Sequence, residues 1–182
     1  MKDPGNYPRW VLDVVQPGDV LEDDESLMRR AIAVAHSCIE STKGGPFGAL
    51  LADDAGRIIA VGYNQVVPSN DSTAHAEMLV IRRAEQALGT FRLRDEKLPR
   101  LRLFTSCAPC IMCTGAIHWA GVPEVIAAAR AEDVESIGFL EGPRNLDIPA
   151  FFAARDIAYR ADVLRDEARE VIGHYTGPIY NG

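Results

Sequence analysis

Long apolar runs, cysteine and excess positive charge are all scarce in this chain of 182 residues. No segment approaches the roughly 18 to 20 consecutive apolar residues that a membrane-spanning helix needs. The N-terminal sequence MKDPGNYPRW carries an acid and two prolines where a secretion signal has an apolar stretch. We therefore expect a soluble protein of the cytoplasm with no membrane partner.

Basic side chains are outnumbered, because 19 lysines and arginines stand against 26 aspartates and glutamates and give a net charge of −7. Neutralising phosphates supplies much of the affinity of proteins for nucleic acids, so no nucleic-acid partner is expected. Residues 92–102 form the most basic stretch, but they also carry acids, which is typical of a solvated loop. The length suits one domain over residues 1–182. Residues 1–22 contain three prolines and two glycines and are interpreted as an extended arm lying on that domain.

Strand-like and helical patterns alternate along the rest of the chain. Apolar residues recur at helical spacing in segments 25–41, 75–89, 109–119 and 165–175. Segments with the pattern of strands are 47–53, 57–64, 101–105, 124–129 and 157–164. This alternation predicts an α/β sandwich with helices on both faces of the sheet.

Three of the four cysteines, Cys107, Cys110 and Cys113, fall within seven residues. Such spacing favours metal ligation or redox chemistry over a disulfide framework. In a reducing cytoplasm the thiols stay free, which favours thiolates that bind a metal. Burial as small apolar side chains is the alternative. Cys38 falls on the apolar side of the first long helix and is expected in the core.

Two short motifs carry the chemistry, His75-Ala76-Glu77 and the segment 109–113, Pro-Cys-Ile-Met-Cys. Each opens a predicted helix, where free N–H groups favour thiolates. Cys110 and Cys113 lie about one helical turn apart, so that they can share one tetrahedral ion with His75. These three ligands leave a fourth position for water, as in a catalytic zinc site. Glu77 lies two residues from His75, close enough to take a proton from that water. Cys107 is interpreted as a non-ligand, because a fourth protein ligand would occupy the position of the water.

The order H-x-E followed by P-C-x-x-C is the signature of zinc-dependent nucleobase deaminases. From about residue 27 to residue 141 the sequence resembles the cytidine deaminase superfamily and, within it, the bacterial guanine deaminases. The segments that carry this resemblance are 44–49, 62–64, 69–77, 105–110, 115–120 and 137–141. The tRNA adenosine deaminases share much of the first half, but they usually have Leu-Glu-Pro-Cys where residues 106–110 here read Ser-Cys-Ala-Pro-Cys.

The resemblance implies a cytidine deaminase-like fold, a three-layer α/β/α sandwich around a five-stranded mixed sheet. It also implies hydrolytic deamination of guanine to xanthine and ammonia, in which zinc-bound hydroxide attacks C2. In this scheme Zn²⁺ is held by His75, Cys110 and Cys113, and Glu77 moves the proton. Glu141 matches a second acid of the guanine branch, where it suits the N–H-rich edge of guanine and relays protons.

The remaining substrate contacts are also implied by the resemblance. Asn64 is expected to hydrogen-bond the base edge, and Ala76 to lie against the substrate. Phe47 and Trp119 are expected to give flat apolar contacts to the ring. Residues 142–182 depart from the family pattern and are interpreted either as a segment that closes the site, with Tyr180 or Tyr175 near the base, or as a frayed tail.

Several alternatives stay open at this point. The rival activities are deamination of adenosine in tRNA and deamination of another amino-heterocycle, such as cytosine, a nucleoside or an aminotriazine. A zinc-stabilised module without activity is the non-enzymatic alternative, although a structural site has no use for an unligated Glu77. The sequence does not separate free guanine from guanosine. A homodimer is expected from the resemblance alone.

Overall fold

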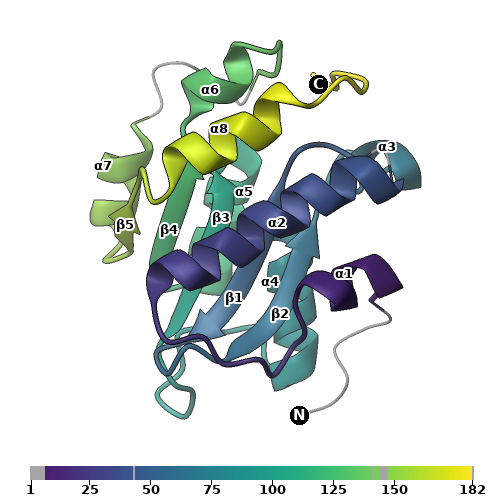
Figure 1. Cartoon of the computed structure of the whole chain (residues 1–182). Helices are drawn as coiled ribbons and strands as arrows, with labels where there is room; N and C mark the ends of the chain where they lie inside the picture. The colour runs from purple at the N-terminus through teal and green to yellow at the C-terminus, as the bar shows by residue number, and fades with distance from the viewer. Residues whose placement is uncertain (1–6, 43, 141, 144–146, 182) are drawn as a thin grey trace.

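Figure 1 shows the computed structural model, which describes residues 7–42, 44–140, 142–143 and 147–181. These residues contain a five-stranded sheet in the order β2-β1-β3-β4-β5. The strands are β1 (Gly48–Asp53), β2 (Ile58–Tyr63), β3 (Leu101–Cys107), β4 (Glu124–Ala129) and β5 (Ala158–Arg160). Strand β1 is antiparallel to β2 and β3, whereas β3, β4 and β5 are parallel, so the sheet is mixed as expected.

Helices cover both faces of the sheet (Figure 1), which confirms the predicted three-layer architecture. One face packs against α1 (Arg9–Val14), α2 (Asp24–Thr42) and α8 (Arg165–Gly173). The other packs against α4 (Ala76–Leu88), α5 (Ile111–Ala120) and α7 (Ile148–Ala153). The short helices α3 (Val66–Ser69) and α6 (Ala131–Glu135) lie in connections. Because both faces are covered, every residue of β1 and β2 is buried.

Local signals in the sequence set the ends of the longer helices. The Asp23 carboxylate accepts a hydrogen bond from the backbone N–H of Ser26 at 2.7 Å and so caps the first turn of α2. Gly89 and Gly121 end α4 and α5 with φ angles of 69° and 72°, a left-handed conformation that glycine adopts without a steric cost.

The N-terminal segment corrects one prediction. Residues 1–22 were expected to be extended, but Arg9–Val14 form helix α1, and Val11 and Val15 are buried against α2 and the sheet. A helix of six residues makes less than two turns, which is too short for an apolar period to appear in the sequence. Farther on the arm is extended, where Val20 forms an isolated bridge with Arg57.

The sheet order brings two helix N-termini together. Strands β2 and β3 are both antiparallel to β1, so they run in the same direction and their carboxyl ends lie at the same edge. The chain leads from β2 through α3 to the start of α4, and from β3 to the start of α5. The two motifs of the sequence therefore meet at this edge.

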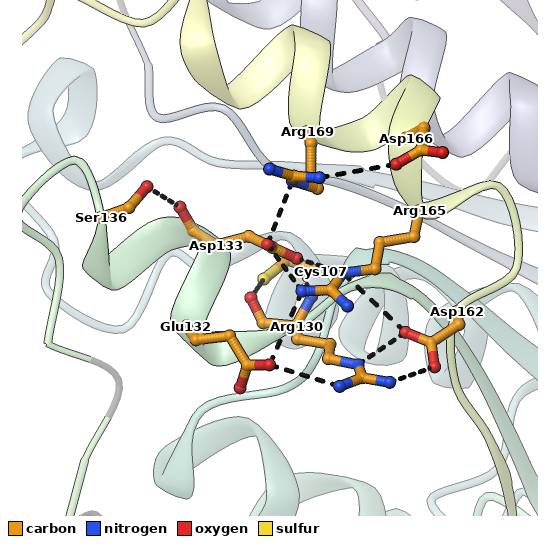
Figure 2. A network of polar contacts seen from close by, with 9 residues as sticks. All are labelled: Cys107, Arg130, Glu132, Asp133, Ser136, Asp162, Arg165, Asp166 and Arg169. Carbon is orange, nitrogen blue, oxygen red and sulfur yellow. Dashed lines mark hydrogen bonds and ion pairs between the residues drawn. The ribbon is translucent and has the colours of Figure 1, made fainter.

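A polar network joins α6 to α8 near the carboxyl ends of β3 and β4 (Figure 2). Asp133 is its centre, because its carboxylate accepts hydrogen bonds from the backbone N–H of Arg130 at 2.8 Å and from the guanidinium of Arg165 at 2.8 and 2.9 Å. The carbonyl of Arg130 in turn accepts a hydrogen bond from the Cys107 thiol, with 3.6 Å between the two atoms. The network thus connects the C-terminal helix to the strand that leads into α5.

In the part of the chain that the structure describes, no helix combines the length and the apolar sequence needed to cross a bilayer.

Candidate active site

Three side chains converge where α4 and α5 begin. His75 is the N-cap of α4, Cys110 is the N-cap of α5, and Cys113 lies in the first turn of α5. The His75 ring nitrogen and the two sulfurs all lie within 4.8 Å of one another, and His75 Nδ1 is 3.6 Å from Cys110 Sγ. One imidazole nitrogen and two thiolates suit tetrahedral zinc, and they leave one coordination position open. The donor set therefore fits the expected ion.

The two thiols have opposite pKa shifts. The hydrogen bond from the Cys113 thiol lowers the pKa of Cys110 to about 4, so Cys110 is a thiolate at neutral pH. The same hydrogen bond and burial raise the pKa of Cys113. The backbone N–H of Cys113 also donates to Cys110 Sγ at 3.5 Å. A helix N-terminus thus stabilises one thiolate in advance, and metal binding would release the proton of the other.

Glu77 lies directly beside the ligand set. It is 6% exposed, and its Oε2 is 3.5 Å from Cys113 Sγ. Its Oε1 accepts a hydrogen bond from the Thr105 hydroxyl at 3.0 Å. Burial, followed by the negative charge of Cys110, raises the pKa of the Glu77 carboxyl. A carboxyl group with a raised pKa at this place is suited to take a proton and to return it.

Asn64 is fully buried at the end of β2, where its amide has a fixed orientation. Its Oδ1 accepts hydrogen bonds from the backbone N–H groups of Gly45 and Val66, both at 3.2 Å. Its Nδ2 has no hydrogen-bond partner among the described residues. Leaving a buried donor unpaired costs about 1–3 kcal/mol, so this group is suited to a ligand that offers an acceptor.

A cavity of about 450 Å³ adjoins the ligand set and is lined in part by His75, Cys110, Met112 and Tyr180. The Tyr180 ring lies 6.3 Å from the His75 ring, and the two are near perpendicular. Tyr180 also approaches Gly45, where an added Cβ would lie 2.1 Å from the Tyr180 hydroxyl oxygen. The C-terminal segment therefore lies against the same cavity as the metal ligands.

Tyr175, the other tyrosine considered from the sequence, has a different position. It is buried, and its hydroxyl donates to the carbonyl of Pro178 at 2.7 Å. Its ring packs on Phe139, 5.7 Å between centroids. Tyr175 thus fixes the path of the C-terminal segment, whereas Tyr180 lines the cavity.

Phe47 and Ala76, two of the other residues expected to contact the substrate, both lie near the residues described above. The Phe47 ring is half-buried, packs on Phe139 at 5.3 Å and is close to Gly45. Ala76 is buried as the first residue of α4, next to His75. Glu141 lies outside the described residues.

Trp119 is not brought to this cavity. It is 83% exposed near the end of α5, six residues beyond Cys113 and so about 9 Å farther along the helix axis. There it borders a separate hollow of about 260 Å³, together with His118, Arg92 and Arg155. Within one copy of the chain, the structure therefore gives Trp119 no contact with a ligand at His75.

The two remaining cysteines are not part of the ligand group. The Cys107 thiol is directed to the carbonyl of Arg130, as the network of Figure 2 shows. Cys38 lies in the core, where its thiol donates to the carbonyl of Asn64 at 3.1 Å and burial raises its pKa to about 11. Both positions agree with the interpretation of these residues as non-ligands.

Two residues at the site were not found from the sequence. The first is Thr105, whose hydroxyl contacts Glu77. The second is Asn181, whose side-chain amide accepts a hydrogen bond from the N–H of Leu140 at 2.8 Å and donates one to the carbonyl of Gly138 at 3.0 Å. Thr105 follows the apolar pair Leu103-Phe104 inside a buried strand, and a polar residue at such a position is a signal that could have indicated it. Nothing in the sequence around Asn181 indicates its partners, which are some forty residues away.

Comparison with known proteins places this geometry in a family. Residues 21–129 match the model of the cytidine and deoxycytidylate deaminase zinc-binding region. The chain belongs to this deaminase family. The family match and the ligand set together make it a zinc-binding hydrolytic deaminase.

Individual deaminases support the same assignment. The guanine deaminase of Bacillus subtilis is 45% identical over 128 residues, which cover 69% of this chain and 78% of the relative. The solved guanine deaminase of Nitrosomonas europaea is 37% identical, covers 93% of both chains and superposes with a TM-score of 0.88. A further structure, solved with 2,6-diaminopurine, is 38% identical over 97% of this chain and 95% of its own, with a TM-score of 0.89. These structures confirm the predicted cytidine deaminase-like fold.

Proposed function

We propose that this deaminase converts guanine to xanthine and ammonia by hydrolysis. The observation that carries the proposal is the site itself, in which a zinc-type ligand set lies beside a buried carboxyl group at Glu77. The likeness to guanine deaminases supports the choice of substrate, and tRNA-specific adenosine deaminases are weaker matches. The net charge of −7 also disfavours an RNA substrate.

Asn64 supports a purine that carries hydrogen-bond acceptors. Because Gly45 and Val66 occupy its Oδ1, only the Nδ2 donor is available to a ligand. Guanine offers O6 and N7 as acceptors at its edge. Tyr180 and Phe47 supply aromatic surface near that position, and the cavity has room for a free base.

Zinc, when bound, activates water for attack near neutral pH. The residues of the chain then have distinct roles in the proposed reaction. His75, Cys110 and Cys113 hold the ion, and Glu77 takes a proton from the attacking water and delivers it to the purine. The buried position of Glu77 keeps bulk water from competing for that proton. Glu141 is proposed as a second acid on the N–H-rich edge of guanine.

Replacing Glu77 by glutamine tests the proposal, since the amide keeps the size of the side chain and removes the proton acceptor. Ammonia release from guanine by the zinc-loaded enzyme should fall by about 100- to 10,000-fold. Zinc content, measured by elemental analysis, should stay at the wild-type value. Full activity in Glu77→Gln would show that the proposed mechanism is wrong.

The substrate is tested with a panel of guanine, guanosine, cytosine, cytidine, an aminotriazine and a tRNA anticodon stem-loop that contains adenosine. Turnover of guanine alone would support the proposal and a pocket too closed for ribose. Turnover of the stem-loop would favour the tRNA alternative. Turnover of cytosine or the aminotriazine without guanine would favour deamination of another heterocycle.

We further propose that the protein acts as a homodimer in the cytoplasm. Ile111 and Leu140 line the cavity and yet are 49% and 64% exposed, so apolar surface surrounds the entrance. A second copy would cover this surface and close the site. The cytoplasm would keep the four free thiols reduced. Light scattering should give twice the monomer mass, and Leu140→Asp should reduce it to that of a monomer.

A further inference from the structure

Thr105 is a buried polar residue in strand β3. It is 2% exposed, and it pairs with Ala49 of β1. Because side chains alternate along a strand, Thr105 lies on the same face as Leu103, which packs in the core beneath α4 and α5. A hydroxyl in this apolar layer needs hydrogen-bond partners. Both of its partners belong to the surroundings of the metal ligands.

The first partner is the Glu77 carboxylate, whose Oε1 accepts from the Thr105 hydroxyl at 3.0 Å. With Oε1 held by the strand, the other oxygen, Oε2, faces Cys113 Sγ at 3.5 Å. A glutamate has three rotatable side-chain torsions, and a contact at one oxygen restricts all of them. Thr105 therefore determines which oxygen of Glu77 faces the ligand set.

The second partner is the carbonyl of Cys107, which lies 2.9 Å from the same hydroxyl. A hydroxyl has one proton to donate and two lone pairs that accept. While Glu77 is a carboxylate, Thr105 can donate to it. A proton taken up on Oε2, the oxygen that faces the ligand set, leaves Oε1 an acceptor, so Thr105 can still donate to it. The residue can hold Glu77 in place on both sides of a proton transfer without moving itself.

We propose that Thr105 is a positioning residue that keeps Glu77 aimed at the zinc ligands throughout the deamination cycle. This inference rests on the proposed function of Glu77. Thr105 acts through the carboxylate and not on the substrate, so its loss should lower kcat and leave KM unchanged. It should also leave zinc binding unchanged, because the Thr105 hydroxyl hydrogen-bonds Glu77 and the carbonyl of Cys107 and none of the three ligands.

The test compares Thr105→Val, which has the same shape without the hydroxyl, with Thr105→Ser, which keeps the hydroxyl. Thr105→Val should lose about 10- to 100-fold in kcat for guanine, the range of a lost hydrogen bond to a charged group. Its KM should stay within about twofold and its zinc content at the wild-type value. Thr105→Ser should recover most of the rate. Wild-type kcat in Thr105→Val, or equal losses in both variants, would overturn the proposal.

A structural measurement separates this inference from the proposed function. In crystals of zinc-loaded Thr105→Val, the Glu77 carboxylate should occupy more than one conformation, whereas the wild type and Thr105→Ser should show one. This result does not depend on the substrate. If the wild type does not deaminate guanine, the proposed function fails, but the position of Glu77 still decides the role of Thr105. A single unchanged conformer in Thr105→Val would contradict that role.

Discussion

Asn64 has no exposed surface, and both donors to its Oδ1 are backbone N–H groups. Two N–H donors at Oδ1 leave only one orientation of the amide, since turning it over would place NH₂ against N–H. The Cys38 thiol fixes the same residue from the core side through its carbonyl oxygen. The amide is thus prepared to donate one hydrogen bond to a ligand, and the ligand atom must be an acceptor.

Purine analogues can show which acceptor Asn64 recognises. 2-Aminopurine lacks O6, and 7-deazaguanine lacks N7. One of these two purine atoms is expected to accept the hydrogen bond from Asn64 Nδ2. The analogue that lacks this atom should have a kcat/KM about 10- to 100-fold below that of guanine, because the buried Nδ2 donor is then left unpaired. Asn64→Ala should remove this difference between the analogue and guanine. Steady-state kinetics check both, and an unchanged difference in Asn64→Ala would mean that another residue recognises that edge.

The two tyrosines of the C-terminal segment differ in what they touch, so their variants should differ in kinetics. Tyr180 lines the cavity near His75, whereas the Tyr175 hydroxyl donates to the carbonyl of Pro178, away from the cavity lining. We expect Tyr180→Ala to raise KM for guanine by about 10-fold or more, given the apolar area that an aromatic ring contributes. Tyr175→Phe, which removes only one hydrogen bond, should change KM by less than about threefold. A larger increase in KM for Tyr175→Phe than for Tyr180→Ala would show that Tyr175 closes the site.

At the scale of elements, the long helices and the strands follow from the sequence because their signals are local. Apolar spacing, the Asp23 cap and the glycines that end α4 and α5 each lie within the element they define. The short helices α1 and α3 were missed, since four to six residues are too few to show a period. The polar network of Figure 2 was also missed, because Asp133 and Arg165 lie 32 residues apart.

Asp133 is expected to stabilise the contact between α6 and α8. Its side chain is nearly buried, and Arg165 is the main cause that lowers its carboxyl pKa below the ordinary value of 3.8. Asp133→Asn should reduce the free energy of unfolding by about 1–3 kcal/mol at pH 7, because the charged hydrogen bonds from Arg165 and the ion pair with Arg169 are lost. Urea unfolding measures this. Asp162→Asn, at a more exposed ion pair, is the control and should cost about 1 kcal/mol or less.

The pH dependence of this effect has a definite sign. A carboxyl group with a lowered pKa in the folded state contributes stability above its unfolded pKa and loses it as the pH falls through its folded pKa. The deficit of Asp133→Asn should therefore be equal at pH 7 and pH 5. It should shrink only as the pH falls below about the ordinary value of 3.8, because there the unfolded chain binds a proton that the folded carboxyl, with its lowered pKa, does not yet bind. A deficit that already shrinks between pH 7 and pH 5 would contradict the ion pair as its origin.

At the scale of the whole molecule, the spacing within a motif predicts that the residues of that motif lie together, but it does not predict which distant residues join them. His75, Glu77, Cys110 and Cys113 could be assigned because each pair lies within one helical turn, and the fold needs only to bring two helix ends together. The position of Trp119 does not follow from such spacing. It shares a helix with the ligands, but the helix carries it away from them. Tyr180 reaches the site through the C-terminal segment, which the contacts of Tyr175 with Phe139 and of Asn181 with Gly138 hold beside the cavity.

The same arrangement makes zinc a link between distant parts of the chain. His75 and Cys110 cap two helices that follow different strands, so one ion joins segments 35 residues apart. An ion that binds the folded state alone stabilises it by about 2.7 kcal/mol when its free concentration is 100 times the dissociation constant. For a chain of this length that corresponds to roughly 5–10 °C in Tm. Removing zinc with a chelator should lower Tm by such an amount and abolish ammonia release, and added zinc should restore both.

Cysteine variants separate this effect from general damage to the fold. Cys113→Ala should bind no zinc tightly, and its Tm should no longer respond to the chelator. Cys107→Ala, in which a nearby non-ligand thiol is lost, should keep one zinc per chain and the full response. Because the Cys113 thiol must lose its proton to bind the ion, the zinc-dependent part of Tm should decrease as the pH falls. A chelator response that persists in Cys113→Ala would place the stabilising ion elsewhere.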